Sequence, residues 1–225
     1  IKEANPSKIF FLVDNNTHRD CLAVFLKKLE SPENVEILEI EAGEINKNLE
    51  TCTGLWNALS ELDADRKSLM INIGGGVVTD LGGFVASTFK RGIRYINVPT
   101  SLLAMVDASV GGKTGVDLGN LKNQIGVINH AEMVIIDPAF LGTLPQAEMR
   151  SGLAEILKHA LISSETYWNK VTNLSELTLD DLDEIIKESV EIKTKVVTED
   201  PEEHGLRKTL NYGHTLGHAI ESYFL

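Results

Sequence analysis

The sequence predicts an α/β fold in which a Rossmann-like parallel sheet is followed by an all-helical part. Three observations support this prediction. Apolar runs of strand length alternate with segments of helix length over residues 1–142, several of these runs end at polar or glycine-rich turns, and residues 143–225 read as helices without a strand between them. We therefore expect an α/β domain over residues 1–142 and a helical domain over residues 143–225.

Five segments are predicted as strands because they are rich in apolar residues and are bounded by turn signals. They are Lys8–Asp14, Val35–Glu41, Ser68–Ile73, Arg94–Pro99 and Met133–Asp137. The helices expected between them are His18–Glu30, capped by Asn16 or Thr17, then Leu49–Asp63, Thr79–Phe89 and Ser101–Ser109. Ligands of parallel sheets bind beyond the carboxyl ends of the strands, so we expect functional residues there.

The second part is predicted to contain the helices Gln146–Ile162, Leu177–Val197 and Lys208–Leu225. The last of them carries His214 and His218 in the pattern G-H-T-L-G-H. Residues four apart share one face of a helix, so the two imidazoles can meet a divalent metal, or one can bind metal while the other faces a substrate. Two histidines that merely share a helix are the alternative.

Composition excludes some classes of function. The net charge of −12 and the pI of about 4.9 argue against a nucleic-acid partner. No apolar run approaches the roughly 20 residues that span a bilayer, so no membrane association is expected. The two cysteines lack metal spacing and do not resemble a disulfide framework, which favours the cytoplasm. The chain opens without methionine and stops at the predicted last helix, so truncation at both ends is expected.

A glycine run, Gly74-Gly75-Gly76, follows a predicted strand and precedes a predicted helix. This context suits a pyrophosphate cradle, because backbone N–H groups and the helix N-terminus attract phosphate. The run departs from the standard dinucleotide fingerprint, since Thr79 stands where the third glycine would be. A simple tight turn, with Asp80 as a helix cap, is the alternative.

A second glycine-rich stretch, Asp107–Gly115, contains Lys113 and is followed by Lys122-Asn123. A glycine loop with two lysines indicates a phosphate or carboxylate site, although solvated surface lysines on a loop would look the same.

Two predicted helices carry charged residues beside their apolar stripes. Glu155 lies next to small residues, with Lys158 one turn away and His159 as an alternative metal ligand, but a surface ion pair would give the same pattern. Lys193 falls on the inward face of its helix, eleven residues after Leu182. A buried lysine is costly unless an anion meets it, so Lys193 indicates an anionic ligand unless it extends out to solvent.

Five stretches of the chain, in this order, strongly resemble the 3-dehydroquinate synthase family. They are GGGVVTDLGGFVASTFKRG, VPTSLLAMVDASVGGKTGVD, LKNQIG, GLAEILKHA and LRKTLNYGHTLGHAIE. The resemblance runs from about Asp14 to the end of the chain. It implies an NAD-binding domain followed by a helical metal-binding domain, similar in fold to iron-dependent alcohol and glycerol dehydrogenases.

The resemblance also implies individual site residues. Those matched to NAD binding are Asp14, Asn16, Glu44, Lys47, Gly75, Gly76, Asp80, Thr100, Ser101, Lys113 and Lys122. Those matched to the substrate are Asp107, Lys113, Asn123, Lys158, Lys193, Arg207, Asn211 and His218. Glu155 and His214 match two ligands of a zinc or cobalt ion, and the family's third ligand, a histidine, is expected beyond Leu225. Arg91 matches an arginine that is lent across a dimer interface, which implies a homodimer.

The activity that the resemblance implies is the conversion of a sugar acid phosphate, 3-deoxy-D-arabino-heptulosonate 7-phosphate, to 3-dehydroquinate and phosphate, with NAD regenerated in each cycle. Three alternatives stay open. They are an NAD-dependent polyol or glycerol-type dehydrogenase, a cyclase of another sugar phosphate, and a non-catalytic NAD-binding module that only dimerises. An uncharged polyol would not require the lysines and arginine matched to the substrate, which argues against the first alternative.

Overall fold

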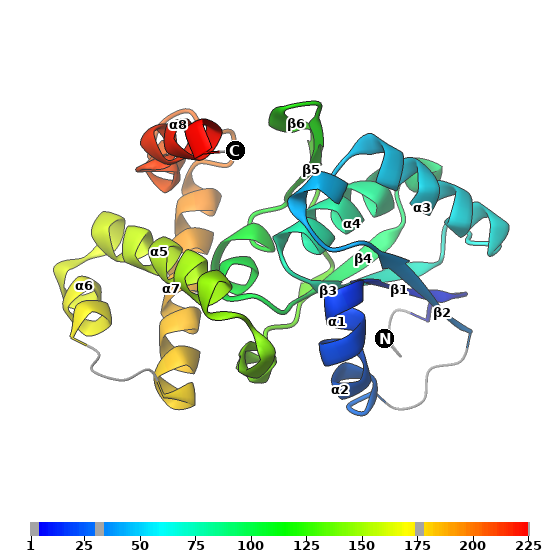
Figure 1. The fold of residues 1–225 in the computed structure, drawn as a ribbon, viewed down its shortest axis with the longest axis horizontal. Coiled ribbons are helices and arrows are strands. Elements are labelled where there is room, and N and C mark those ends of the chain that lie inside the picture. Colours follow the sequence, from blue (N-terminus) through cyan, green and yellow to red (C-terminus); the bar gives the residue numbers. More distant parts are fainter. Residues whose placement is uncertain (1–4, 30–33, 174–177, 225) are drawn as a thin grey trace.

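A computed structural model describes residues 5–29, 34–173 and 178–224 of the chain. Its centre is a five-stranded parallel sheet with the strand order β2-β1-β3-β4-β7 (Figure 1). The strands are β1 (Ile9–Asp14), β2 (Val35–Ile40), β3 (Leu69–Gly74), β4 (Arg94–Pro99) and β7 (Met133–Val134). The predicted parallel sheet is therefore confirmed, with each strand close to its expected position.

Helices follow most of these strands. The described helices are α1 (Asn15–Thr17), η1 (His18–Leu22), α2 (Ala23–Leu26), η2 (Glu44–Asn46), α3 (Leu49–Glu61), α4 (Gly76–Thr88), η3 (Phe89–Arg91), η4 (Ala104–Ala108), η5 (Pro138–Thr143), α5 (Gln146–Ser163), α6 (Glu165–Thr172), α7 (Leu179–Glu199), η6 (Leu206–Asn211) and α8 (His214–Phe224). The described part of the chain after β7 contains helices and no strand, as predicted. The predicted helix ends at Glu30, Leu177 and Leu225 lie outside the described residues.

The sheet is covered on both faces, and β1 shows this most clearly because its side chains from Ile9 to Val13 are all apolar and buried. In β1, Phe10 and Leu12 pack in the cluster that contains residues of α3 and α4. Phe11 and Val13 point to the other face, into a cluster that continues through Met105 to residues of α5 and α7. The helical part is thus joined to the sheet by a shared apolar core.

Three local predictions were wrong. The first helical segment is capped by Asp14, whose carboxylate accepts the Thr17 N–H at 2.8 Å, and not by Asn16 or Thr17. The glycine-rich stretch around Lys113, expected as a loop, enters an antiparallel hairpin of β5 (Lys113–Leu118) and β6 (Leu121–Ile128). The predicted final helix is interrupted at Gly213, whose φ of +86° ends η6 before α8 begins.

A buried amide pair lies in the middle of the sheet beneath α4. The Asn72 Nδ2 group on β3 donates to Asn97 Oδ1 on β4 at 2.8 Å, and both residues are buried. Helix α4 approaches this pair closely because residue 82 is glycine, where an added Cβ would lie 2.2 Å from Asn72 Oδ1. Separately, no helix in the described ranges is both long and apolar enough to cross a membrane.

Candidate active site

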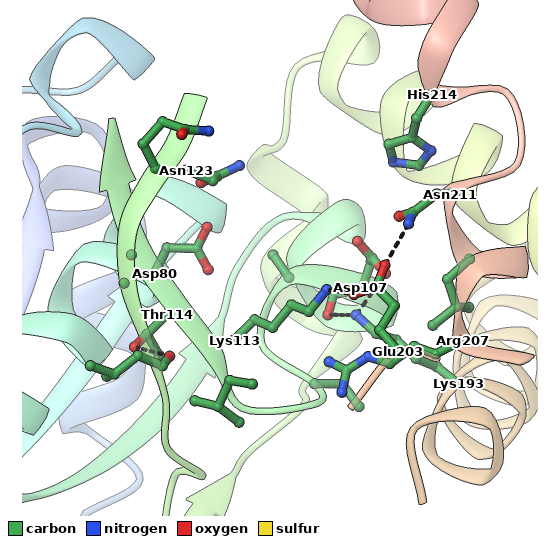
Figure 2. A pocket seen from close by; sticks show the side chains of 18 of the residues that line it. Asp80, Asp107, Lys113, Thr114, Asn123, Lys193, Glu203, Arg207, Asn211 and His214 are labelled. Carbon is green, nitrogen blue, oxygen red and sulfur yellow. Dashed lines mark hydrogen bonds and ion pairs between the residues drawn. The ribbon is translucent and has the colours of Figure 1, made fainter. Parts of the chain in front are cut away.

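Two cavities lie next to each other beyond the carboxyl ends of the strands. The first, of about 770 Å³, is lined by the end of β1, the start of α4 and the residues after β4. The second, of about 630 Å³, lies between the β5–β6 hairpin and helices η4, α5, α7 and η6 (Figure 2). Asp80 and Ala108 line both cavities, so the two spaces adjoin at these residues.

The first cavity gathers most residues that the resemblance assigned to NAD. They are Asp14, Asn16, Glu44, Lys47, Gly75, Gly76, Asp80, Thr100 and Ser101. Of the other two assigned residues, Lys113 lines the second cavity and Lys122, on β6, is among the lining residues of neither. The expected location at the strand ends follows from the topology of a parallel sheet.

The start of α4 can hold an anion through its backbone. Gly75 is the N-cap and no side chain caps the first turn, so the first N–H groups of the helix have no side-chain partner. An added Cβ would come within 3.3 Å of Ser101 Oγ at Gly75 and within 3.4 Å of Ala108 Cβ at Gly76. The glycines therefore leave room for a phosphate at the positive end of the helix dipole.

A buried ion pair marks the boundary between the cavities. The ammonium group of Lys47, which is 4% exposed, donates to Asp80 Oδ2 at 2.7 Å and to Asn123 Oδ1 at 2.7 Å. Burial raises the pKa of Asp80 to about 6, against the opposing effect of Lys47. Near pH 6, Asp80 therefore changes between a protonated carboxyl group and a carboxylate that pairs with Lys47.

Cations from four separate elements converge on the second cavity. Lys113 comes from β5, Lys193 from α7 and Arg207 from η6 (Figure 2). The fourth, Lys158, comes from α5. The lining residues matched to the substrate are Asp107, Lys113, Asn123, Lys158, Lys193, Arg207 and Asn211, and His214 also lines the cavity. The residues matched to the substrate that the structure brings together here are up to 104 positions apart, from Asp107 to Asn211.

Lys193, which was predicted to need an anionic partner, pairs with the carboxylate of Asp107. Lys193 is 8% exposed, and its Nζ donates to Asp107 Oδ1 at 2.7 Å and to the Asp107 carbonyl at 2.6 Å. Burial alone would raise the pKa of Asp107, but Lys193 and Lys158 outweigh it and lower that pKa to about 2. This pair fixes α7 against η4.

Glu203 is a cavity residue that was not predicted. Its carboxylate forms an ion pair with Lys113 and accepts from Asn211 Nδ2 at 2.6 Å, and these contacts lower its pKa, with Lys113 as the main cause. The turn that presents it is held by Asp200, whose carboxylate accepts the backbone N–H groups of Arg207, Gly205 and His204; these bonds lower its pKa to about 2. The acidic run EDPEE before Arg207 is the sequence signal that could have identified this turn.

The candidate metal ligands form a group that differs from the predicted pair. Glu155 accepts from Lys158, and the ligand atoms of Asp107, Glu155 and His159 lie within 4.8 Å of one another. His159 was the alternative ligand. Its Nδ1 lies 2.5 Å from Ser189 Oγ, its buried Nε2 has no partner in the described part of the chain, and burial followed by Lys158 lowers its pKa to about 4.

Two of the predicted residues, His214 and Arg91, lie apart from this group. His214 begins α8 and lines the second cavity, but it is not a member of the cluster within 4.8 Å. His218 is on α8, and its side chain lies outside what the structure describes. Arg91 ends η3, is exposed, and lines neither cavity.

Comparisons with known proteins identify the family of this chain. Residues 37–151 match the model of the 3-dehydroquinate synthase N-terminal family, and residues 152–225 match the model of the C-terminal family. A curated relative, the 3-dehydroquinate synthase of Parabacteroides distasonis, is 45% identical over 217 residues, which are 96% of this chain and 61% of the relative. The chain therefore spans about three fifths of that relative's length.

Two solved structures show a similar fold. A 2-deoxy-scyllo-inosose synthase in complex with carbaglucose-6-phosphate, NAD⁺ and Co²⁺ matches with a TM-score of 0.85 at 28% identity, over 99% of this chain and 63% of the other. The 2-epi-5-epi-valiolone synthase of Streptomyces hygroscopicus, with NAD⁺ and Zn²⁺ bound, matches with a TM-score of 0.80 at 28% identity, over 94% of this chain and 63% of the other.

Proposed function

The chain belongs to the 3-dehydroquinate synthase family, and on that premise we propose that it carries the NAD-binding and anion-binding parts of an enzyme that converts 3-deoxy-D-arabino-heptulosonate 7-phosphate to 3-dehydroquinate and phosphate. The observation that carries this proposal is the junction of the two cavities. A glycine cradle suited to pyrophosphate shares Asp80 and Ala108 with a cavity lined by four cations. A substrate with a carboxylate and a phosphate requires such a cavity, whereas an uncharged polyol does not.

The residues of the first cavity fit NAD. The open cradle at Gly75 and Gly76 would take the pyrophosphate, while Asp14 and Asp80 offer carboxylates to ribose hydroxyls. For the metal, the carboxylate and imidazole donors near Glu155 suit zinc or cobalt, which the solved cyclases bind. Glu155 would be a ligand together with His214, or with His159 in the alternative set.

The chemistry follows from what these groups do. When bound, NAD supplies the hydride acceptor and donor, and the divalent metal supplies a Lewis acid for the substrate oxygen. Lys113, Lys158, Lys193 and Arg207 bind the carboxylate and phosphate of the substrate and stabilise the negative charge on the departing phosphate. The three lysines must exchange their present carboxylate partners, Glu203, Glu155 and Asp107, for the carboxylate and phosphate of the substrate.

Two further properties belong to this proposal. Arg91 is exposed at the end of η3, where a second copy could receive it, which supports the homodimer that the resemblance implies. Cys21 and Cys52 are both free and buried, in agreement with a reducing compartment such as the cytoplasm.

Phosphate release is the direct test. The longest available form of this chain would be incubated with the heptulosonate phosphate, NAD⁺ and Zn²⁺ while absorbance follows NADH. We expect phosphate release without accumulation of NADH, because the cofactor is regenerated. Stoichiometric NADH without phosphate would instead identify a dehydrogenase.

Arg207 provides a test of the substrate class. Its guanidinium, 3% exposed, donates to the carbonyls of Pro201 at 2.9 Å and Gly111 at 3.3 Å, at the edge of the cavity. Arg207→Ala should raise the KM for the heptulosonate phosphate by roughly tenfold or more while changing kcat less. An unchanged KM would remove this role.

A cyclase with another substrate is the second candidate, because the two similar solved structures are those of a 2-deoxy-scyllo-inosose synthase and a 2-epi-5-epi-valiolone synthase. Turnover of glucose 6-phosphate but not of the heptulosonate phosphate would favour it.

A further inference from the structure

The pairing of the β5–β6 hairpin is irregular close to the boundary between the two cavities. Its register shifts between Val116 and Leu118, so that residues 122–124 of β6 face the single residue Asp117. Within this bulge Asn123 adopts a φ of +52°, a left-handed conformation that is uncommon for a residue with a side chain. Bulges of this kind redirect a side chain and are frequent next to functional sites.

Asp117 holds this bulge through two hydrogen bonds. Its Oδ1 accepts the backbone N–H of Asn123 at 2.7 Å, and its own N–H donates to the carbonyl of Lys47 at 2.9 Å. Asp117 is partly buried and is not among the lining residues of either cavity. It therefore contacts the backbone of two cavity residues without lining a cavity itself.

The two residues that Asp117 holds also contact each other. The Lys47 ammonium donates to Asn123 Oδ1 and to Asp80 Oδ2, each at 2.7 Å. A closed ring of hydrogen bonds thus runs from Asp117 to Asn123, to Lys47 and back. Lys47 lines the first cavity, Asn123 lines the second, and Asp80 lines both.

We propose that Asp117 is a positioning residue that holds Asn123 in its left-handed conformation and thereby fixes the Lys47 ammonium at the junction of the two cavities. The expected effect of Asp117 on ligand binding rests on the proposed function, in which Lys47 binds the cofactor. The expected effect of Asp117 on the position of the Lys47 ammonium rests only on the ring of hydrogen bonds among Asp117, Asn123 and Lys47. Without the Asp117 carboxylate, Asn123 loses the bond that stabilises its backbone, and Lys47 loses one of its two acceptors within hydrogen-bond distance.

Two measurements test the proposal in parallel. The first is the rate at which acetic anhydride acetylates Lys47, followed by mass spectrometry and normalised to Lys195, which is exposed on α7. The second is the Kd for NADH from fluorescence titration. Asp117→Ala should raise the rate of Lys47 acetylation and the Kd for NADH by about fivefold each, as expected for the loss of one hydrogen bond around a buried ammonium. Asp117→Asn keeps an oxygen acceptor at Oδ1 and should stay within about twofold of the parent.

Asp65→Ala is the matched control, because the Asp65 carboxylate also accepts a backbone N–H, that of Lys67 at 2.8 Å, and lines neither cavity. It should leave both readouts unchanged. Lys47 acetylation in Asp117→Ala within about twofold of the parent, or equal effects of the alanine and asparagine variants, would overturn the proposal. Faster Lys47 acetylation in a chain that binds no NADH would support the ring while rejecting the proposed cofactor.

Discussion

The two cavities of this chain are built from different groups. The first cavity depends on backbone at the carboxyl ends of β1, β3 and β4, and N–H groups at the start of α4 form its candidate anion cradle. The second cavity depends on charged side chains, and Lys113, Lys158 and Lys193 each form an ion pair within the chain. The backbone cradle is complete without a ligand, whereas the lysines of the second cavity would have to exchange their carboxylate partners for the anionic groups of a ligand.

The largest effect is expected from breaking the ion pair between Lys193 and Asp107 in the second cavity. Lys193→Met removes the cation that meets Asp107 and should lower phosphate release by roughly a thousandfold. It should also reduce the free energy of unfolding by roughly 2–3 kcal/mol, because the partly buried Asp107 carboxylate loses its hydrogen-bonded cation and keeps only the attraction of Lys158. Activity assays and chemical denaturation measure the two effects.

Lys195→Met is the control for that variant, since Lys195 lies exposed on the same helix. It should change neither quantity. A loss of activity of less than about tenfold in Lys193→Met would show that the pair is not central to the cavity.

A smaller effect is expected at the boundary between the cavities, where Asp80 has a pKa of about 6 in place of 3.8. Because the folded-state pKa is raised, the native chain binds this proton more tightly than the unfolded chain. Its contribution to stability is fully present below about pH 4 and is lost as the pH rises through about 6. The parent should therefore lose on the order of 2 kcal/mol of its free energy of unfolding between pH 4 and pH 7 through this group. Asp80→Asn should not show this loss.

Chemical denaturation at both pH values checks this expectation, with Asp183→Asn, exposed on α7, as the control. The same difference from the parent at both pH values would mean that Asp80 titrates normally.

The smallest effect is expected from the backbone cradle. Gly76→Ala places a methyl group 3.4 Å from Ala108 Cβ, an ordinary contact, so the chain should fold normally. The methyl group occupies space in the cradle and should raise the NADH Kd by roughly tenfold in a fluorescence titration. Gly54→Ala, on the exposed side of α3 with no atom within 4 Å, should leave the Kd unchanged. An unaltered Kd in Gly76→Ala would place the phosphates elsewhere.

The same contrast explains what could be predicted from the sequence. The residues that the resemblance matched to NAD largely follow strand ends, and apolar runs such as the one in β1 identify those ends locally. The hairpin was missed because its pattern does not alternate: Thr114 is buried, while Leu118 and Leu121 are exposed. Glu203 was missed because it acts through partners 90 and 8 residues away, Lys113 and Asn211, which no local pattern reveals. The last helix was predicted in one piece because G-H-T-L-G-H has helical spacing, and its first glycine, Gly213, was counted as part of the helix although it forms the break.

The contact between Gly82 and Asn72 constrains how this sequence can change over generations. A side chain at position 82 would overlap the Asn72 amide, so most substitutions there are blocked while Asn72 remains. Replacing Asn72 first would leave Asn97, which is also buried, without its amide partner. The three positions therefore change most easily together, and single-step mutational paths out of this arrangement pass through a less stable protein.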